Sequence, residues 1–270
     1  MIRIDDPDDA RIDHYRAVRD RDLAGRGGRF LAEGEVVLRA LLGPRGRFQA
    51  ESLLLSESRA DSIAPTLASL APSLPVYVAG QRVMDTIVGF HIHRGALGIG
   101  LRGPHKAASD LLSAVPDCAL ILCLVGLANH DNVGGAFRNA AAFGADGVLL
   151  DRTSCDPLYR KAIRVSVGAS LQVPFAWAGS ADEMIDALAG AGFETFALNP
   201  LRSALARSSK LAKAHGAACR GGGSGAPGTR PRAAPRAAHR HGAGLRFAQC
   251  GDRIRHCAPR RSAQRRGPFD

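Results

Sequence analysis

This 270-residue sequence lacks several patterns that identify common classes of protein. No apolar run is long enough to cross a bilayer, and the polar, acidic beginning MIRIDDPDDARIDHYRAVRD is unlike a secretory signal, so we expect a cytoplasmic protein. The six cysteines form no C-x-x-C pair, which removes the usual zinc and thioredoxin-type motifs. His91 and His93 have no acidic or cysteine partner nearby, so we expect no metal site.

Basic charge is also scarce through most of the chain, despite a formal net charge of +11. Residues 1–200 hold 20 Lys and Arg against 23 Asp and Glu, a net of −3. Residues 201–270 hold 16 Lys and Arg against two acidic residues, a net of +14. Such a tail indicates either a basic disordered arm for nucleic acid or a segment that is not meaningful protein sequence.

The sequence does contain two successive α/β patterns, joined by residues 104–117, which we interpret as a linker. In the first, residues 1–103, we expect strands near 29–32, 51–58, 74–80 and 94–102 and helices near 35–42 and 81–89. In the second, residues 118–217, we expect strands near 118–126, 146–151, 171–177 and 193–199 and helices near 132–144, 157–170 and 181–192. This alternation predicts a Rossmann-like parallel sheet with ligands at the carboxyl ends of its strands.

The loop after strand 118–126 carries the residues of greatest chemical interest. It reads LANHDNVGGAFRN and contains no G-x-G-x-x-G fingerprint, P-loop or G-x-S-x-G elbow. Asn132 can hold a loop by hydrogen bonds, and Gly134 and Gly135 let a ligand approach closely. Arg138 can present its guanidinium to a phosphate or carboxylate. The alternative for Arg138 is a simple ion pair with an acidic side chain.

The order N-x-G-x-x-x-R-x-A-x-x-F-G-[AV]-x-x-V-x-L over 132–150 resembles the first motif of the SpoU-type RNA ribose methyltransferases of the SPOUT superfamily. The following segment, DPLYRKAIRVSVGASLQVPF, resembles the family's next block through Ser166, Gly168, Ala169 and Pro174. RFLAEGEVVLRALL and GFHIHRGALGIGLR are similar to the family's L30e-like substrate-recognition domain. The likeness extends to about residue 218.

The resemblance implies an enzyme that transfers a methyl group from S-adenosylmethionine to a ribose 2′-hydroxyl of tRNA or rRNA. It places Arg138 at the hydroxyl, where we favour a positioning and electrostatic role because arginine scarcely loses its proton. Asn132 would order the catalytic loop, and Arg26, Arg29 and Glu33 are weaker candidates for RNA contact. The resemblance also implies a homodimer, no membrane association and a C-terminal trefoil knot that binds the cofactor.

The family builds that knot from two later motifs, approximately G-x-E-G-x-G-L and I-P-M-x-x-x-x-x-S-L-N-V-x-x-A, and neither occurs in this sequence. Back-translation of residues 243–260 with a shift of one nucleotide permits G-F-D-S-L-N-V-A-T-A-S-G-I-A-L-H. The same shift over residues 216–230 permits A-L-L-V-G-A-E-G-P-G-L. We therefore interpret residues 218–270 as a frame-shifted, disordered tail, with the shift close to Ala217–Ala218.

On this interpretation the domain at 118–217 is incomplete and the knot is lost. We expect this chain to be inactive, to leave S-adenosylmethionine unbound, and to expose apolar strand residues at 120–125 and 148–150. Its cofactor-binding residues stay unknown. Two alternatives remain open: a non-catalytic RNA-binding remnant, and an unrelated Rossmann-like nucleotide-binding enzyme, against which the missing fingerprint after strand 118–126 argues.

Overall fold

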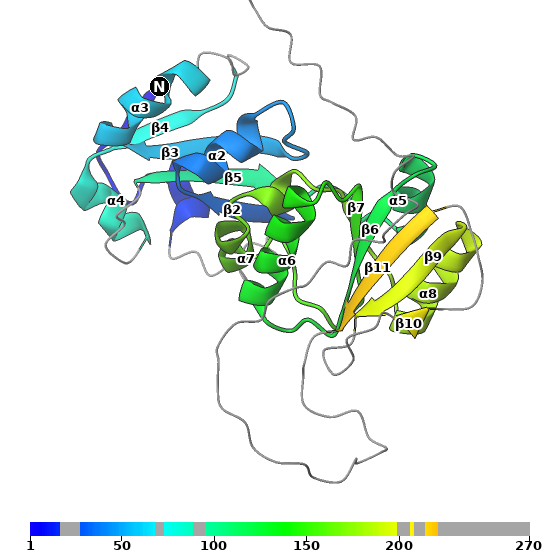
Figure 1. Ribbon diagram of the computed structural model, residues 1–270. Helices are drawn as coiled ribbons and strands as arrows, with labels where there is room; N and C mark the ends of the chain where they lie inside the picture. The colour runs from blue at the N-terminus through cyan, green and yellow to red at the C-terminus, as the bar shows by residue number, and fades with distance from the viewer. Residues whose placement is uncertain (17–27, 68–72, 89–94, 199–205, 208–213, 221–270) are drawn as a thin grey trace, which may run out of the picture. The chain divides into compact units, whose positions relative to one another are not determined.

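The computed structural model describes residues 1–16, 28–67, 73–88, 95–198, 206–207 and 214–220 (Figure 1). The strands are β1 (Ile2–Ile4), β2 (Arg29–Glu33), β3 (Gln49–Ser56), β4 (Val76–Ala79), β5 (Ala96–Leu101), β6 (Leu120–Val125), β7 (Gly147–Leu150), β8 (Phe175–Trp177), β9 (Phe193–Leu198), β10 (Ala206–Arg207) and β11 (Ala214–Arg220). The helices are η1 (Ala10–Tyr15), α2 (Glu35–Leu42), α3 (Glu57–Leu67), α4 (Gln81–Val88), α5 (Ala108–Ala114), α6 (His130–Ala142), α7 (Arg160–Val165), η2 (Ala169–Leu171) and α8 (Ala181–Gly190). The strands and helices expected from the sequence are present, most with shifted ends, except that the single helix expected over 157–170 is divided into α7 and η2.

The first sheet has the strand order β1-β4-β3-β5-β2. Its strands β1, β4 and β3 are parallel, whereas β5 runs antiparallel to both β3 and β2. A G-x-G-x-x-G string does occur at 98–103, within and just after β5. Because β5 is an interior strand of an antiparallel ladder, these glycines do not form the turn between a strand and a helix that binds dinucleotides. A Cβ at Gly98 would lie 2.7 Å from Leu38, and one at Gly100 would lie 2.2 Å from Phe30, so packing explains them.

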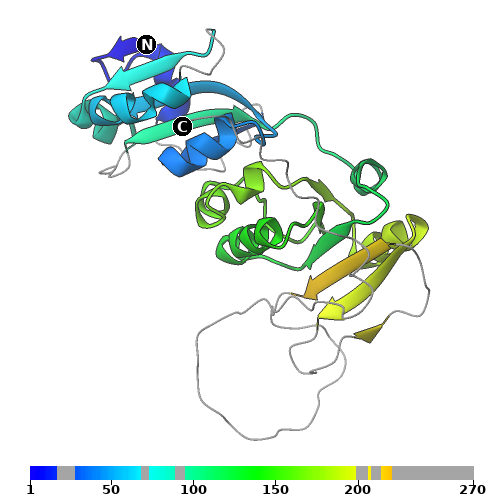
Figure 2. The same ribbon diagram turned by 45° about the horizontal axis from the view of Figure 1, so that its top comes forward.

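The second sheet has the strand order β10-β9-β11-β6-β7-β8 and is parallel except for β10 (Figure 2). Helices α5 and α8 cover one face, where Leu111, Leu112, Met184 and Leu188 pack on Ile121, Cys123 and Leu149. Helix α6 packs on the other face, and α7 packs on α6. The apolar runs at 120–125 and 147–150 are therefore strands buried from both sides, as the sequence predicts.

Strand β11 was not expected, because AHGAACR has little of the apolar character of a central strand. It lies between β9 and β6 and is parallel to both, so it continues three residues past the predicted boundary at 217. Our expectation of exposed apolar strand residues is wrong. β11 pairs with β6 along its length, and Ile121–Leu124 and Val148–Leu150 are at most 1% exposed.

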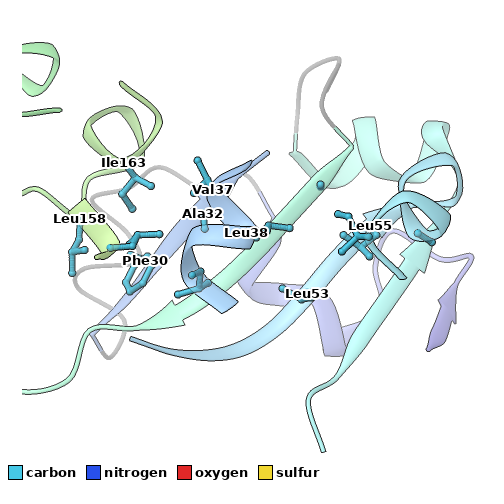
Figure 3. Close-up of a cluster of buried hydrophobic side chains, with 13 residues drawn as sticks. Phe30, Ala32, Val37, Leu38, Leu53, Leu55, Leu158 and Ile163 are labelled. Carbon is cyan, nitrogen blue, oxygen red and sulfur yellow. The ribbon is translucent and has the colours of Figure 1, made fainter. Parts of the chain in front are cut away.

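The described residues all belong to one compact unit. One apolar cluster joins the first sheet to the segment after β7: Phe30 and Val37 lie against Leu158 and Ile163 (Figure 3). The range predicted as a linker contains α5, whose Leu111 and Leu112 belong to the core of the second sheet. Within the described residues, no helix combines the length and apolar character needed to cross a bilayer.

Candidate functional site

The candidate site lies where β6 and β7 end, since parallel strands bring their carboxyl ends to one edge of the sheet. Helix α6 begins at His130, two residues before the predicted start, because Asn129 caps it: the Asn129 side chain accepts a hydrogen bond from the Asp131 N–H at 2.8 Å. Asn132 is therefore in the first turn of α6 and exposed. The hydrogen bond that holds the turn comes from Asn129, not from Asn132.

The two glycines of α6 have different environments. Gly134 is buried, and a Cβ there would lie 2.7 Å from the Ala162 carbonyl oxygen and 2.8 Å from the Val165 Cβ. Gly134 thus permits the close packing of α6 on α7, and it does not provide the approach for a ligand that we expected. A Cβ at Gly135 would meet no atom within 4 Å, so this position is open.

Arg138 lies in the second half of α6 with its side chain exposed. Among the described residues it has neither a hydrogen bond nor an ion pair, so the alternative of a simple ion pair finds no partner there. A guanidinium in this state is available to an external anion.

Asp151, directly after β7, joins the loops that follow β6 and β7. Its carboxylate is 4% exposed and accepts hydrogen bonds from the Gly126 N–H (3.1 Å), the Thr153 hydroxyl (2.5 Å) and the Ser154 hydroxyl (2.6 Å) and N–H (2.9 Å). Burial alone would raise the pKa of Asp151, but these hydrogen bonds to the ionised form outweigh it and lower the pKa. Ser154 in turn accepts from the Leu127 N–H at 3.1 Å.

Helix α7 contacts the beginning of α6 through polar and aromatic groups. The Lys161 ammonium lies 2.7 Å from the Asp131 carboxylate, and the rings of His130 and Tyr159 stack with centroids 3.8 Å apart. Burial and the nearby Lys161 charge lower the pKa of His130 below its usual value. The imidazole is therefore neutral at pH 7 and adds no positive charge to this surface.

The residues expected to contact RNA in the first domain have partners within the protein. Arg29 pairs with Glu51 through two contacts of 2.6 Å. Glu33 is 7% exposed, and its carboxylate lies 2.9 Å from Arg160 of α7. Arg26 lies outside the described residues. Glu33 is thus placed in the packing between β2 and α7, which does not fit a direct contact with RNA.

The turn after α7 contains the other residues that match the family block. Ser166 is buried, and its hydroxyl donates to the Ile163 carbonyl at 2.9 Å. Gly168 has φ +81°, and a Cβ there would lie 2.7 Å from the Ala40 Cβ of α2. Ala169 begins η2, and Pro174 directly precedes β8. These residues shape a turn that packs on the first domain, and none of them projects a reactive group.

Sequence reasoning missed Asn129, Asp151, Ser154 and Lys161. Asp151 had a usable signal, because an acidic residue directly after a buried strand commonly faces the loops at that edge. The pairing of Lys161 with Asp131 depends on how two helices pack and has no local signal. In the part of the chain that the structure describes, no three His, Cys, Asp or Glu residues are placed to hold a metal ion. His91 and His93 lie outside that part.

Comparisons with known proteins agree with this geometry. The sequence profile of the SpoU rRNA methylase family matches residues 119–218. An uncharacterized tRNA/rRNA methyltransferase of Mycobacterium bovis is 34% identical over 199 residues, which cover 72% of this chain and 67% of the relative. The chain belongs to the SpoU rRNA methylase family. The family membership predicted from the 132–150 motif is thus confirmed.

Two solved structures of RNA methyltransferases share the fold of this chain. The AdoMet-bound rRNA methyltransferase from Sinorhizobium meliloti has a TM-score of 0.61 at 17% identity, covering 85% of this chain and 92% of that one. An RNA 2′-O ribose methyltransferase has a TM-score of 0.57 at 23% identity, covering 81% of each chain. The predicted α/β fold with a SPOUT-like parallel sheet is confirmed.

Proposed function

We propose that the family reaction of this protein is methyl transfer from S-adenosylmethionine to a ribose 2′-hydroxyl of tRNA or rRNA. The observation that carries the proposal is the exposed Arg138, which has no partner among the described residues and lies on α6, the helix that follows β6 within the segment matched by the SpoU profile. The structural likeness to an RNA 2′-O ribose methyltransferase supports ribose as the target.

Arg138 acts by charge and position. Arginine is a poor general base, so Arg138 is not assigned that role. It holds an RNA phosphate or the hydroxyl oxygen as negative charge develops there, and a fixed donor of this kind contributes about 10²–10³ in rate. Asn132, six residues earlier and exposed in the first turn of α6, completes the RNA side of the site.

The residues present in this chain do not fit a binding site for S-adenosylmethionine. In the family, a Glu of G-x-E-G and the Ser and Asn of S-L-N-V belong to the motifs of the cofactor-binding knot. Here β11 ends at Arg220, and no acidic residue lies between Glu194 and Asp252. We therefore propose that this chain keeps the RNA side of the site and lacks the side that binds S-adenosylmethionine, so that it is an RNA-binding remnant without activity.

A shift of reading frame near Ala217–Ala218 accounts for this loss. The family profile stops at residue 218, which supports the proposed position, and back-translation with a one-nucleotide shift permits the G-x-E-G-x-G-L and S-L-N-V residues of the two missing motifs. On this proposal the knot is absent, the residues after the shift are not family sequence, and the net charge of +10 that residues 218–270 carry, from 12 Lys and Arg against two acidic residues, is accidental. The frame-restored protein would act as a homodimer, with residues 1–103 as an L30e-like RNA-recognition domain.

The test is methyl transfer by the frame-restored chain. We expect radiolabel from S-adenosylmethionine to enter tRNA or rRNA as 2′-O-methylated nucleosides, and Arg138→Ala to lower kcat/KM by about 100-fold or more. Lys106→Ala, which removes an exposed charge that precedes α5 and lies outside the first domain, is the control and should leave kcat/KM unchanged. Methylation of bases, or an Arg138→Ala variant as active as the parent, would refute the assignment.

A further inference from the structure

Within residues 118–198 the positive charge is gathered in one region. All five Lys and Arg residues of this range lie on α6, on the loop after β7, or on α7: Arg138, Arg152, Arg160, Lys161 and Arg164. Helix α8, on the opposite face of the sheet, carries only acidic charges. Further cations follow in the chain, among them Arg207 of β10 and Arg220 of β11, so the polarity belongs to residues 118–198, where acidic residues outnumber basic ones.

Helices α6 and α7 present their cations on adjoining surfaces. The two helices lie side by side in both views (Figures 1 and 2) and run in the same direction: Asp131 meets Lys161 at the start of each, and Gly134 meets Val165 further along. Arg138 follows Asp131 by seven residues, which is two turns and about 10 Å, so it lies on the same face of α6.

The three cations of α7 differ in how firmly the protein holds them. Arg160 is 19% exposed and lies 2.9 Å from the buried carboxylate of Glu33, so it is a structural partner of that carboxylate. Arg164 shares the same carboxylate at 3.9 Å and is 41% exposed. One carboxylate cannot neutralise two guanidinium groups, so Arg164 keeps much of its charge for another anion.

Lys161 is also available, although it has a partner. Lys161 is 47% exposed and Asp131 46%, and an ion pair this exposed contributes little to stability. An RNA phosphate can replace the Asp131 carboxylate at small cost. The remaining acidic groups nearby do not compete with RNA for these cations. Asp151 is buried and accepts hydrogen bonds, and Asp156 is paired with Arg102.

We propose that Lys161 and Arg164 of α7, together with Arg138 of α6, form a contact surface for the phosphate backbone of RNA. The proposal rests on the proposed function for the choice of RNA as the partner, and it adds α7 to the substrate-binding surface. In the complex, Lys161 pairs with an RNA phosphate in place of the Asp131 carboxylate. Arg164 pairs with a second phosphate in place of the Glu33 carboxylate, and Arg160 keeps its ion pair with Glu33.

The test measures binding of fluorescein-labelled mixed bacterial tRNA to the full chain across a series of KCl concentrations. Each lost phosphate contact flattens the slope of log K against log[salt] by about 0.7–0.9. The double variant Lys161→Gln/Arg164→Gln should therefore flatten it by about 1.4–1.8 and weaken binding by about tenfold or more at low salt. Thermal unfolding shows whether this variant stays folded, and the charge-conserving pair Lys161→Arg/Arg164→Lys should keep the parental slope.

The control is Lys106→Gln, which removes an exposed charge that precedes α5, outside the first domain, and leaves those of the tail in place. The control should keep the parental slope. An unchanged slope in the α7 variant, an equal loss in the control, or a full chain that binds no tRNA would each overturn the proposal. The assay needs no methyl donor, so its failure is distinct from a failure of methyl transfer by the frame-restored chain.

Discussion

Arg138 on α6 and Asp151 directly after β7 carry charges with opposite surroundings. Arg138 is exposed with no partner among the described residues, and Asp151 is buried among four hydrogen-bond donors. The sequence predicted a role for Arg138 because the segment 132–150 resembles the first motif of the family. The sequence did not predict that Glu33 and Gly134 are buried in contacts with α7, because burial depends on residues far away in the chain.

Asp151 should stabilise the protein in a way that depends on pH. Its pKa is lower in the folded protein than in the unfolded chain, so its contribution is complete above the unfolded value of about 4 and is lost as the pH falls through the folded value. We expect Asp151→Asn to lower the free energy of unfolding by about 2 kcal/mol at pH 7, with a smaller difference near pH 3.

Urea unfolding at the two pH values checks this prediction. Asp186→Asn, an exposed change on α8, is the control and should have little effect at either pH. A destabilisation by Asp151→Asn that is the same at pH 7 and pH 3 would show that the carboxylate charge is not what joins the two loops.

At the scale of elements, the sequence predicted those with strong local patterns. Strands β6 and β7 are continuous apolar runs, and α8 has a serine cap at Ser180 and a glycine after its end. Strand β11 could not be predicted, because its place between β9 and β6 comes from pairing with both neighbours and not from its composition. Helix α5 was likewise not predicted, because its segment begins with Gly and Pro and was interpreted as a linker.

The contact between α6 and α7 gives a paired prediction on neighbouring glycines. Gly134→Ala places a Cβ against the α7 backbone, and we expect it to destabilise the protein by about 1–2 kcal/mol after the gain in helix propensity. Gly135→Ala puts the same methyl group into open space and should stabilise it by about 0.5–1 kcal/mol. Chemical unfolding of both variants measures the two changes in the free energy of unfolding. Changes of the same sign would contradict the packing described for α6.

At the scale of the whole molecule, the two predicted domains are less separate than the sequence suggested. The apolar cluster of Phe30 and Val37 with Leu158 and Ile163, and the ion pair of Glu33 with Arg160, join β2 and α2 to the segment that includes α7. Such contacts link residues more than a hundred positions apart, so no local pattern could reveal them. The tail is the opposite case, because its frame-shifted character was inferred from the sequence and the structure does not test it.

The central claim is that this chain retains the RNA side of a SpoU methyltransferase site and lacks the side that holds the methyl donor. Isothermal titration of S-adenosylmethionine into this chain, and in parallel into the frame-restored chain, tests the claim most directly. We predict micromolar binding by the restored chain and no detectable binding by this one. Micromolar binding by the chain as it stands would contradict the account, because the cofactor site would then be built without the two motifs.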